Sequence, residues 1–201
     1  LGLQPREKLW VAASTHPGEE DLVLAAYEKI RQTSPFVRLL IAPRHPPRAG
    51  DVEACIRRHG FDAVRMTKMK ASGAPEGCVF ILDTVGELLA YYALADVVFV
   101  GGSLVRHGGQ NFLEPASLGK PVMVGPHLFN FRDIAGQFLD RHALALVHGA
   151  DEMAAVAGRL LTDTQEVQGL AQRARELIQE NLGATDRNIS SIKEFMRTDK
   201  S

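Results

Sequence analysis

The chain has 201 residues, of which 45% are hydrophobic and 23% charged, with 23 Lys and Arg against 24 Asp and Glu. This length suits one large domain or two small ones, and the composition is that of a soluble globular fold, which excludes disordered and collagen-like chains. A net charge of −1 gives no global bias toward nucleic acid or an anionic membrane.

Strand and helix patterns alternate along the chain. Short apolar runs predict strands at residues 8–15, 36–42, 63–67, 78–82, 97–100, 121–124 and 144–147. Helices are predicted at residues 17–32, 51–59, 84–95, 115–118 and 132 to about 140, with further helices over the remainder and a polar loop at Ser72-Gly73. The tail from Thr164 is amphipathic, with Leu170, Ala174, Leu177 and Ile178 at helical spacing, and we expect it to pack on the domain.

The alternation predicts the fold class and the place of function. Continuous apolar strands indicate a sheet covered on both faces, and strands that alternate with helices indicate parallel pairing. We therefore expect an α/β fold, a Rossmann-like doubly wound parallel sheet, in which ligands bind at the carboxyl ends of the strands.

Cysteine usage and apolar runs bear on the environment of the chain. Cys55 and Cys78 fit neither a CxxC nor a zinc-ligand spacing, so we expect two buried thiols in a reducing compartment. No apolar run reaches the roughly 18 residues of a membrane span. The first residues carry no apolar signal segment and begin without Met, so we expect a piece of a longer protein.

Three loops that follow predicted strands carry polar groups. The loop from Ser14 to Glu20 matches neither GxGxxG nor the P-loop pattern, and its Thr15 or His16 would either cap the next helix or contact a ligand. Arg44 and Arg48 lie in a loop stiffened by prolines, which is either solvated or suited to grip a phosphate or carboxylate. In the third loop Thr84 and Glu87 have capping-box spacing, and Gly86 indicates a close approach by another element or a ligand.

The richest segment lies between residues 101 and 115. Its four glycines are Gly101, Gly102, Gly108 and Gly109, which allow a backbone with positive φ to come near a ligand. A helix starts directly after, and free N–H groups at its start favour an anion, while Glu114 can accept hydrogen bonds from the two hydroxyls of a ribose. Asn111 and Glu114 also have capping-box spacing. We predict a nucleotide with its phosphate on the loop amides and its ribose on Glu114.

The loop after residue 124 and the histidines complete the predicted edge. Asn130 is expected to cap the following helix, and His127 faces the same crevice. Local positive charge collects in these loops and favours an anionic small ligand: His16, His45, His107, His127, Arg44, Arg48 and Arg106. The remaining histidines (His59, His142 and His148) are predicted to be structural. No metal site and no G-x-S-x-G nucleophile elbow is predicted.

Several motifs occur together and in order. They are Ser14-Thr15-His16 with Gly18-Glu19-Glu20, Pro43-Arg44-His45-Pro46, Asp83-Thr84 with Gly86-Glu87-Leu88, Gly101-Gly102-Ser103, Gly108-Gly109-Gln110-Asn111, Leu113-Glu114-Pro115, and Gly125-Pro126-His127 with Phe129-Asn130-Phe131. The set resembles the 3-deoxy-D-manno-octulosonic acid (Kdo) transferases of Gram-negative lipopolysaccharide synthesis, densely from residue 9 to about 131. Pro17, Val85 and Gln110 depart from the family's pattern.

The resemblance implies a fold and a role. The chain would be the C-terminal half of a glycosyltransferase-B fold, with residues 1–201 as a single donor-binding domain. The donor would be CMP-Kdo and the acceptor a lipid A precursor bound by an N-terminal domain absent from this chain. Transfer would be inverting, without metal ion or cofactor. The full-length enzyme would lie at the cytoplasmic face of the inner membrane, while this fragment would be soluble and bind no nucleic acid.

The resemblance also implies site residues. The family's nucleotide contacts fall on Pro43, Arg44, Val85, Gly86, Glu87, Asn111, Phe112, Leu113 and Glu114. Further candidates are Ser14, His16, Gly108, Gly109 and His127. The family's general base is a Glu of the N-terminal domain, so no catalytic residue is expected here and the fragment alone would bind donor without transfer.

Two other readings remain open from the sequence. The chain could be the nucleotide half of a UDP-sugar transferase or epimerase, which shares the fold and the glycine loop followed by Glu. It could also be a non-catalytic sugar-binding or partner-binding domain, in which the glycine loop serves folding alone.

Overall fold

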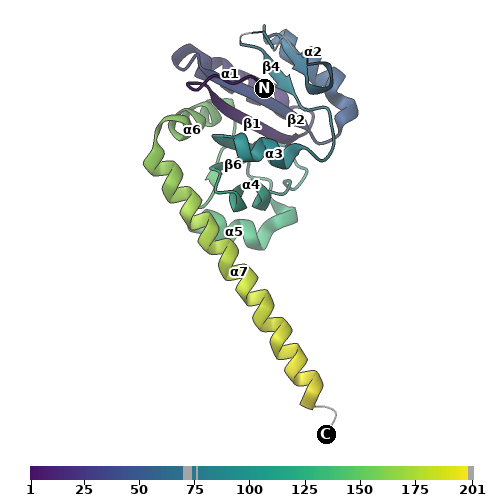
Figure 1. Ribbon diagram of the computed structural model, residues 1–201, viewed down its shortest axis with the longest axis vertical. Coiled ribbons are helices and arrows are strands. Elements are labelled where there is room, and N and C mark those ends of the chain that lie inside the picture. Colours follow the sequence, from purple (N-terminus) through teal and green to yellow (C-terminus); the bar gives the residue numbers. More distant parts are fainter. Residues whose placement is uncertain (70–73, 76, 199–201) are drawn as a thin grey trace.

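Seven parallel strands form one sheet in the described part of the chain (Figure 1). The computed structural model describes residues 1–69, 74–75 and 77–198, with side chains as far as residue 182, so the predicted Ser72-Gly73 loop lies outside it. The strands are β1 (Lys8–Thr15), β2 (Val37–Pro43), β3 (Ala63–Arg65), β4 (Val79–Ile81), β5 (Val97–Val100), β6 (Val122–Val124) and β7 (Ala145–Leu146). Their spatial order is β3-β4-β2-β1-β5-β6-β7, which confirms the predicted doubly wound α/β fold.

Helices cover both faces of this sheet. The longer ones are α1 (Glu19–Thr33), α2 (Ala49–Arg58), α3 (Leu88–Leu94), α4 (Leu113–Ser117), α5 (Arg132–Asp140), α6 (Ala150–Thr162) and α7 (Thr164–Thr198). Single 3-10 turns are η1 (Pro46–Arg48), η2 (Met66–Lys68) and η3 (Phe129–Phe131). Side chains of α1, α2 and α6 pack on one face and those of α3, α4, α5 and α7 chiefly on the other, and each face has its own apolar cluster.

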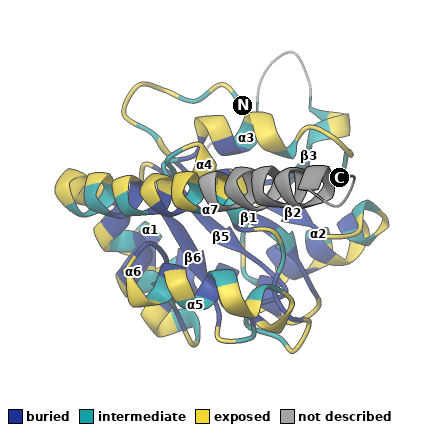
Figure 2. Cartoon of the chain, turned by 90° about the horizontal axis from the view of Figure 1, so that it is seen from below, coloured by how far each residue is buried: buried dark blue, intermediate teal, exposed yellow. Residues whose placement is uncertain are grey.

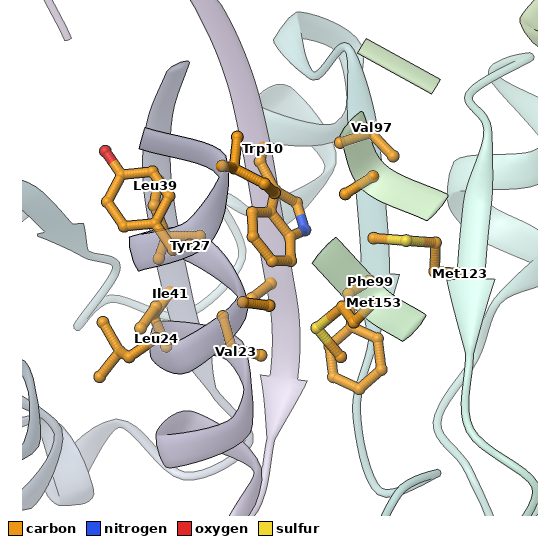
Figure 3. Close-up of a cluster of buried hydrophobic side chains, with 14 of the residues drawn as sticks. Trp10, Val23, Leu24, Tyr27, Leu39, Ile41, Val97, Phe99, Met123 and Met153 are labelled. Carbon is orange, nitrogen blue, oxygen red and sulfur yellow. The ribbon is translucent and has the colours of Figure 1, made fainter. Parts of the chain in front are cut away.

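The central strand β1 shows why the sheet is buried on both sides. Trp10 and Ala12 point into the cluster under α1, whereas Leu9, Val11 and Ala13 point into the opposite cluster. Figure 3 shows Trp10 at the centre of the first cluster, with its ring centroid 6.4 Å from that of Tyr27. These five residues of β1 are all fully buried, which explains why the strand is a continuous apolar run and not an alternating one.

Four helices begin at residues other than those predicted, and one of them, α2, starts two residues early, at Ala49. Helix α1 starts at Glu19, because Gly18 before it adopts a left-handed φ of 92°. Helix α3 starts at Leu88, four residues later than expected, because Gly86 with φ 88° interrupts the turn. Helix α4 starts at Leu113, so Pro115 is its third residue and not its first, as the predicted helix from residue 115 required.

The C-terminal helices divide at Asp163, directly before Thr164, where the amphipathic tail was predicted to begin. Its carboxylate accepts hydrogen bonds from the backbone N–H groups of Gln165 and Glu166, at 2.9 and 3.0 Å, and so caps α7. The predicted apolar positions Leu170, Ala174 and Leu177 are buried. Beyond them α7 extends away from the sheet (Figure 1). Figure 2 shows the strands of the sheet buried among helices whose outer sides are exposed. Among the described residues no helix combines the length and the apolar character that crossing a membrane requires.

Candidate functional site

The strand order creates a crevice at the carboxyl edge of the sheet. Strand β1 lies between β2 and β5, so the loops that follow these strands run to opposite faces and diverge. The loops after β4 and β6 reach the same edge, because all strands are parallel. The edge that was predicted to carry the ligand therefore brings together five loops far apart in the sequence.

A pocket of about 320 Å³ lies between the carboxyl end of β1 and the loops after β2 and β4. Five of the predicted site residues line it: Ser14, Pro43, Arg44, Val85 and Gly86. The backbone N–H of Arg44 donates to the carbonyl oxygen of Thr15 at 3.0 Å, which fixes the second loop to the first. The Arg44 side chain is exposed, and Val85 is 84% exposed. The pocket thus offers a cation, a backbone turn and an uncovered apolar side chain.

Gly86 serves this pocket differently from the prediction. It lies before α3, not inside its first turn, and a Cβ built on it would meet no atom within 4 Å. The residue is therefore required for its left-handed φ of 88°, and the space beside it is open. Glu87 is exposed and accepts a hydrogen bond from the Thr84 hydroxyl. This is a bond between side chains, so the predicted capping box, which needs bonds to backbone N–H groups, does not form.

The predicted ribose site lies in a second depression. Asn111, Leu113 and Glu114 line it together with Ile178 of α7. The Asn111 amide donates to Glu114 Oε1 at 2.9 Å, and Asn111 Oδ1 accepts the N–H of Leu113 at 3.1 Å. Asn111 therefore orients the exposed carboxylate of Glu114 at the start of α4.

Phe112, between these residues, has no side-chain access to a ligand. It is fully buried, and its ring lies 5.6 Å from that of Phe131 and 5.3 Å from that of Phe138. A ligand contact by Phe112 is therefore restricted to its backbone. Burial raises the pKa of Tyr92 on α3, and the nearby Glu114 carboxylate adds to this effect.

A buried carboxylate that the sequence analysis did not single out organises the glycine loop. Glu19 is fully buried and accepts four backbone N–H groups. Its Oε2 binds His16 at 2.9 Å and Gly102 at 2.7 Å, and its Oε1 binds Ser103 at 3.0 Å and Leu104 at 2.9 Å. The carboxylate thus links the loop after β1 to the loop after β5.

This arrangement corrects the predicted phosphate site. The amides of Gly102, Ser103 and Leu104 are already paired with Glu19 and are not available to a phosphate. A Cβ at Gly101 would lie 2.6 Å from the carbonyl oxygen of Ser14. The first glycines of the loop are therefore required by the protein's own packing. The sequence signal available at Glu19 is its place at the start of a helix, and only the β1–β5 pairing brings this residue to the glycine loop.

The other two glycines also contact protein. Gly108 and Gly109 are buried with φ of 88° and 80°, and a Cβ at Gly108 would lie 2.5 Å from Asn130. Asn130 donates to the carbonyl oxygen of His107 at 3.0 Å. It does not cap α5, so the predicted cap at Asn130 is wrong. His127 donates its N–H to the carbonyl oxygen of Ser103 and lines a third depression with Arg132.

Arg48 is not free to bind a ligand. Its guanidinium pairs with both carboxylate oxygens of Glu20, at 2.8 and 3.2 Å, and Glu20 is 2% exposed. The Thr15 hydroxyl donates to the same carboxylate at 2.8 Å. Arg48 therefore holds the loop after β2 against the start of α1, which leaves Arg44 as the exposed cation of that loop.

Three histidines cluster at the mouth of the crevice. The ring of His16 stacks on that of His107 at 4.1 Å and meets the edge of His45 at 6.2 Å. Burial lowers the pKa of His16 to about 4. Nearby positive groups add to this effect: His107, His45, Arg48 and Arg44. His16 is therefore neutral at physiological pH, with Gln110 Nε2 at 3.2 Å from its Nε2. The cluster offers hydrogen-bonding groups at the entrance, not a charged His16.

Comparisons with known proteins identify relatives. No protein-family model matches the chain. The 3-deoxy-D-manno-octulosonic acid transferase of Haemophilus influenzae is 34% identical over 190 residues, which covers 94% of this chain and 44% of that protein. The solved structure of the C-terminal CMP-Kdo binding domain of WaaA from Acinetobacter baumannii is 30% identical, with a TM-score of 0.81 over 87% of this chain and 91% of that domain.

A more distant structure supports the fold alone. The C-terminal domain of the group 1 glycosyl transferase LpcC from Francisella tularensis has a TM-score of 0.57 at 15% identity, over 87% of this chain and 85% of that domain. The chain spans less than half the length of the curated relative from Haemophilus influenzae. Its similarity to that relative therefore concerns one part of a larger protein.

Proposed function

This chain belongs to the family of 3-deoxy-D-manno-octulosonic acid (Kdo) transferases, and we propose that it holds the nucleotide-activated sugar for such an enzyme. Its fold is that of a C-terminal glycosyltransferase-B domain. We take residues 1–201 as a single donor-binding domain. The observation that carries the proposal is the pocket at the carboxyl edge of the sheet, where residues from the end of β1 and from the segments after β2 and β4 lie around the exposed Arg44.

The proposed donor is CMP-Kdo, which carries a phosphate and a sugar carboxylate. The Arg44 guanidinium suits either anion, because its planar fork forms paired hydrogen bonds. Glu114, oriented by Asn111, would accept hydrogen bonds from the ribose hydroxyls. The turn of Val85, Gly86 and Glu87 would lie against the nucleotide, since the space beside Gly86 is open. Neutral His16 would face the sugar.

The proposed chemistry divides between two domains. A glutamate in the part of the enzyme outside this chain would deprotonate the hydroxyl of a lipid A precursor. The alkoxide would attack the anomeric carbon of Kdo with inversion, and CMP would leave with the electron pair of the broken bond. Arg44 would stabilise the charge that develops on the leaving phosphate, without a metal ion or cofactor at the donor site. No residue of this chain acts as the base, so it would bind donor without catalysing transfer.

The site of action follows from the acceptor. A lipid acceptor requires the full-length enzyme to work at a membrane, and we propose the cytoplasmic face of the inner membrane. The chain's net charge of −1 supports no role for nucleic acid.

A titration with mononucleotides tests the proposal. We expect CMP to shift the backbone NMR signals of Arg44, Gly86 and Asn111 in the labelled chain, and UMP and AMP to do so at concentrations at least about tenfold higher, a difference of ~1.4 kcal/mol. Arg44→Ala and Glu114→Ala should each weaken CMP binding. The control Arg57→Ala removes an exposed arginine on α2 that pairs with its helix neighbour Glu53.

The outcomes separate the competing functions. Tighter binding of UMP would support a UDP-sugar enzyme instead. The proposal would be overturned, in favour of a non-catalytic domain, if no nucleotide shifted the signals. It would also be overturned if the Arg44→Ala and Glu114→Ala variants bound CMP as tightly as the unaltered chain.

A further inference from the structure

A second group of reactive side chains lies between α1 and α2. Asp21 and Glu28 are two turns apart on α1 and share a face. Cys55 and His59 are four residues apart at the end of α2. One ligand atom from each of Asp21, Cys55 and His59 lies within 4.8 Å of the other two. None of the four residues lines the pocket of Arg44.

The distances match those of a tetrahedral metal centre. Asp21 Oδ1 lies 3.2 Å from Cys55 Sγ and 3.4 Å from His59 Nε2. Zinc holds sulfur at about 2.3 Å and nitrogen or oxygen at about 2.0 Å, which places neighbouring tetrahedral ligands about 3.3–3.5 Å apart. The three atoms therefore already form two edges of a tetrahedron, with Asp21 at the shared corner. Cys55 is buried, whereas the Asp21 side chain is 51% exposed and leaves access for an ion and a water ligand.

A further carboxylate orients the histidine. Glu28 Oε1 lies 2.6 Å from His59 Nδ1, on the side of the ring opposite to Nε2. A carboxylate on the outer nitrogen of a metal-binding histidine fixes its tautomer and leaves the other nitrogen free to bind. Arg58 Nη2 lies 3.2 Å from Asp21 Oδ1, but its side chain is 63% exposed and can turn into solvent.

We propose that Asp21, Cys55 and His59 form a zinc site that joins α1 to α2, with Glu28 as the positioning residue of His59. Binding forms a zinc–sulfur bond and releases the Cys55 thiol proton to water, with no change of oxidation state. The sequence pattern indicated no metal site and a structural role for His59. A Cys and a His four residues apart lack the third ligand, and only the packing of α1 on α2 adds Asp21 from 34 residues away.

Metal titration of the whole chain tests the site. After removal of metals under reducing conditions, we expect one Co²⁺ per chain to give a near-ultraviolet sulfur-to-cobalt charge-transfer band, and Zn²⁺ to abolish it. Cys55→Ser and His59→Ala should lower zinc affinity by about 100-fold, and Glu28→Gln by about 10-fold. Cys78→Ser is the matched control, because Cys78 is the other buried thiol and contacts Arg38 instead.

Two results would overturn the proposal. One is the absence of the charge-transfer band in the unaltered chain. The other is a band that persists in Cys55→Ser, which would indicate adventitious metal binding elsewhere. Should Cys55→Ser fail to fold, Asp21→Asn takes its place, since it changes an exposed oxygen ligand and keeps the thiol. An unchanged zinc affinity of Asp21→Asn would then overturn the proposal. CMP binding is measured separately, so failure of the zinc site leaves the proposed donor site untouched.

Discussion

Replacement of Glu19 by Gln tests the buried link between the loops after β1 and β5. The side chains are nearly equal in size, so the change leaves no cavity. The amide oxygen of Gln can accept two of the four N–H groups that Glu19 binds, while its NH2 group faces the other two. Each stranded buried donor costs about 1–3 kcal/mol, so we expect a loss of about 2–6 kcal/mol in the free energy of unfolding.

Thermal unfolding of the two proteins measures this loss. For a chain of this size 1 kcal/mol lowers the unfolding midpoint by about 2–4 °C, so a loss near the middle of the range predicts a decrease of roughly 10 °C. Glu166→Gln is the control: it also removes a carboxylate from the first turn of a helix, but its partner is the exposed Arg159. If Glu19→Gln melts within about 2 °C of the unaltered protein, the assigned role of Glu19 is wrong.

Three further predictions concern the same edge of the sheet and its helices. Gly108→Ala adds a Cβ 2.5 Å from Asn130 at a positive φ, so we expect it to lower the free energy of unfolding in urea by about 2–4 kcal/mol. Gly136→Ala, in open space on α5, should raise that free energy by about 0.5–1 kcal/mol. Equal effects of the two changes would contradict the packing of Gly108 against Asn130. Arg48→Ala leaves the Glu20 carboxylate buried without its partner and should cost about 3–5 kcal/mol, and an unchanged unfolding midpoint would refute this. Because the pKa of His16 is lowered to about 4, the unfolded chain binds a proton between pH 6.5 and 4 that the folded chain does not bind. The free energy of unfolding should have its full value above pH 6.5 and decline by about 1–3 kcal/mol as the pH falls toward 4. His16→Gln should reduce this decline, and a decline that persists in the variant would exclude His16 as its cause.

The sequence predicted the sheet because its strands carry local signals. The runs over β1 and β5 are apolar, lie between turn residues, and are found at the predicted bounds. The predicted start of α3 was wrong. Thr84 and Glu87 have capping-box spacing, which placed the start at residue 84, but Gly86 adopts a left-handed φ that a pattern of residue types does not reveal.

The candidate site was predictable only in part, for a related reason. Parallel topology predicts that the loops of Ser14, Arg44 and Gly86 share an edge, and the structure brings them into one pocket. The partners of buried charges depend on strand order and helix packing. From the sequence, Arg48 was therefore left as either solvated or ligand-binding, although it pairs with Glu20. The amides of the glycine loop were assigned to a phosphate, although Glu19 binds three of them.

A crystal structure of the chain soaked with CMP tests the donor site most directly. We expect nucleotide density in the crevice, with the phosphate within hydrogen-bonding distance of the Arg44 guanidinium and the ribose hydroxyls on the Glu114 carboxylate. A crevice that stays empty at saturating CMP, or a nucleotide bound away from both side chains, would contradict it.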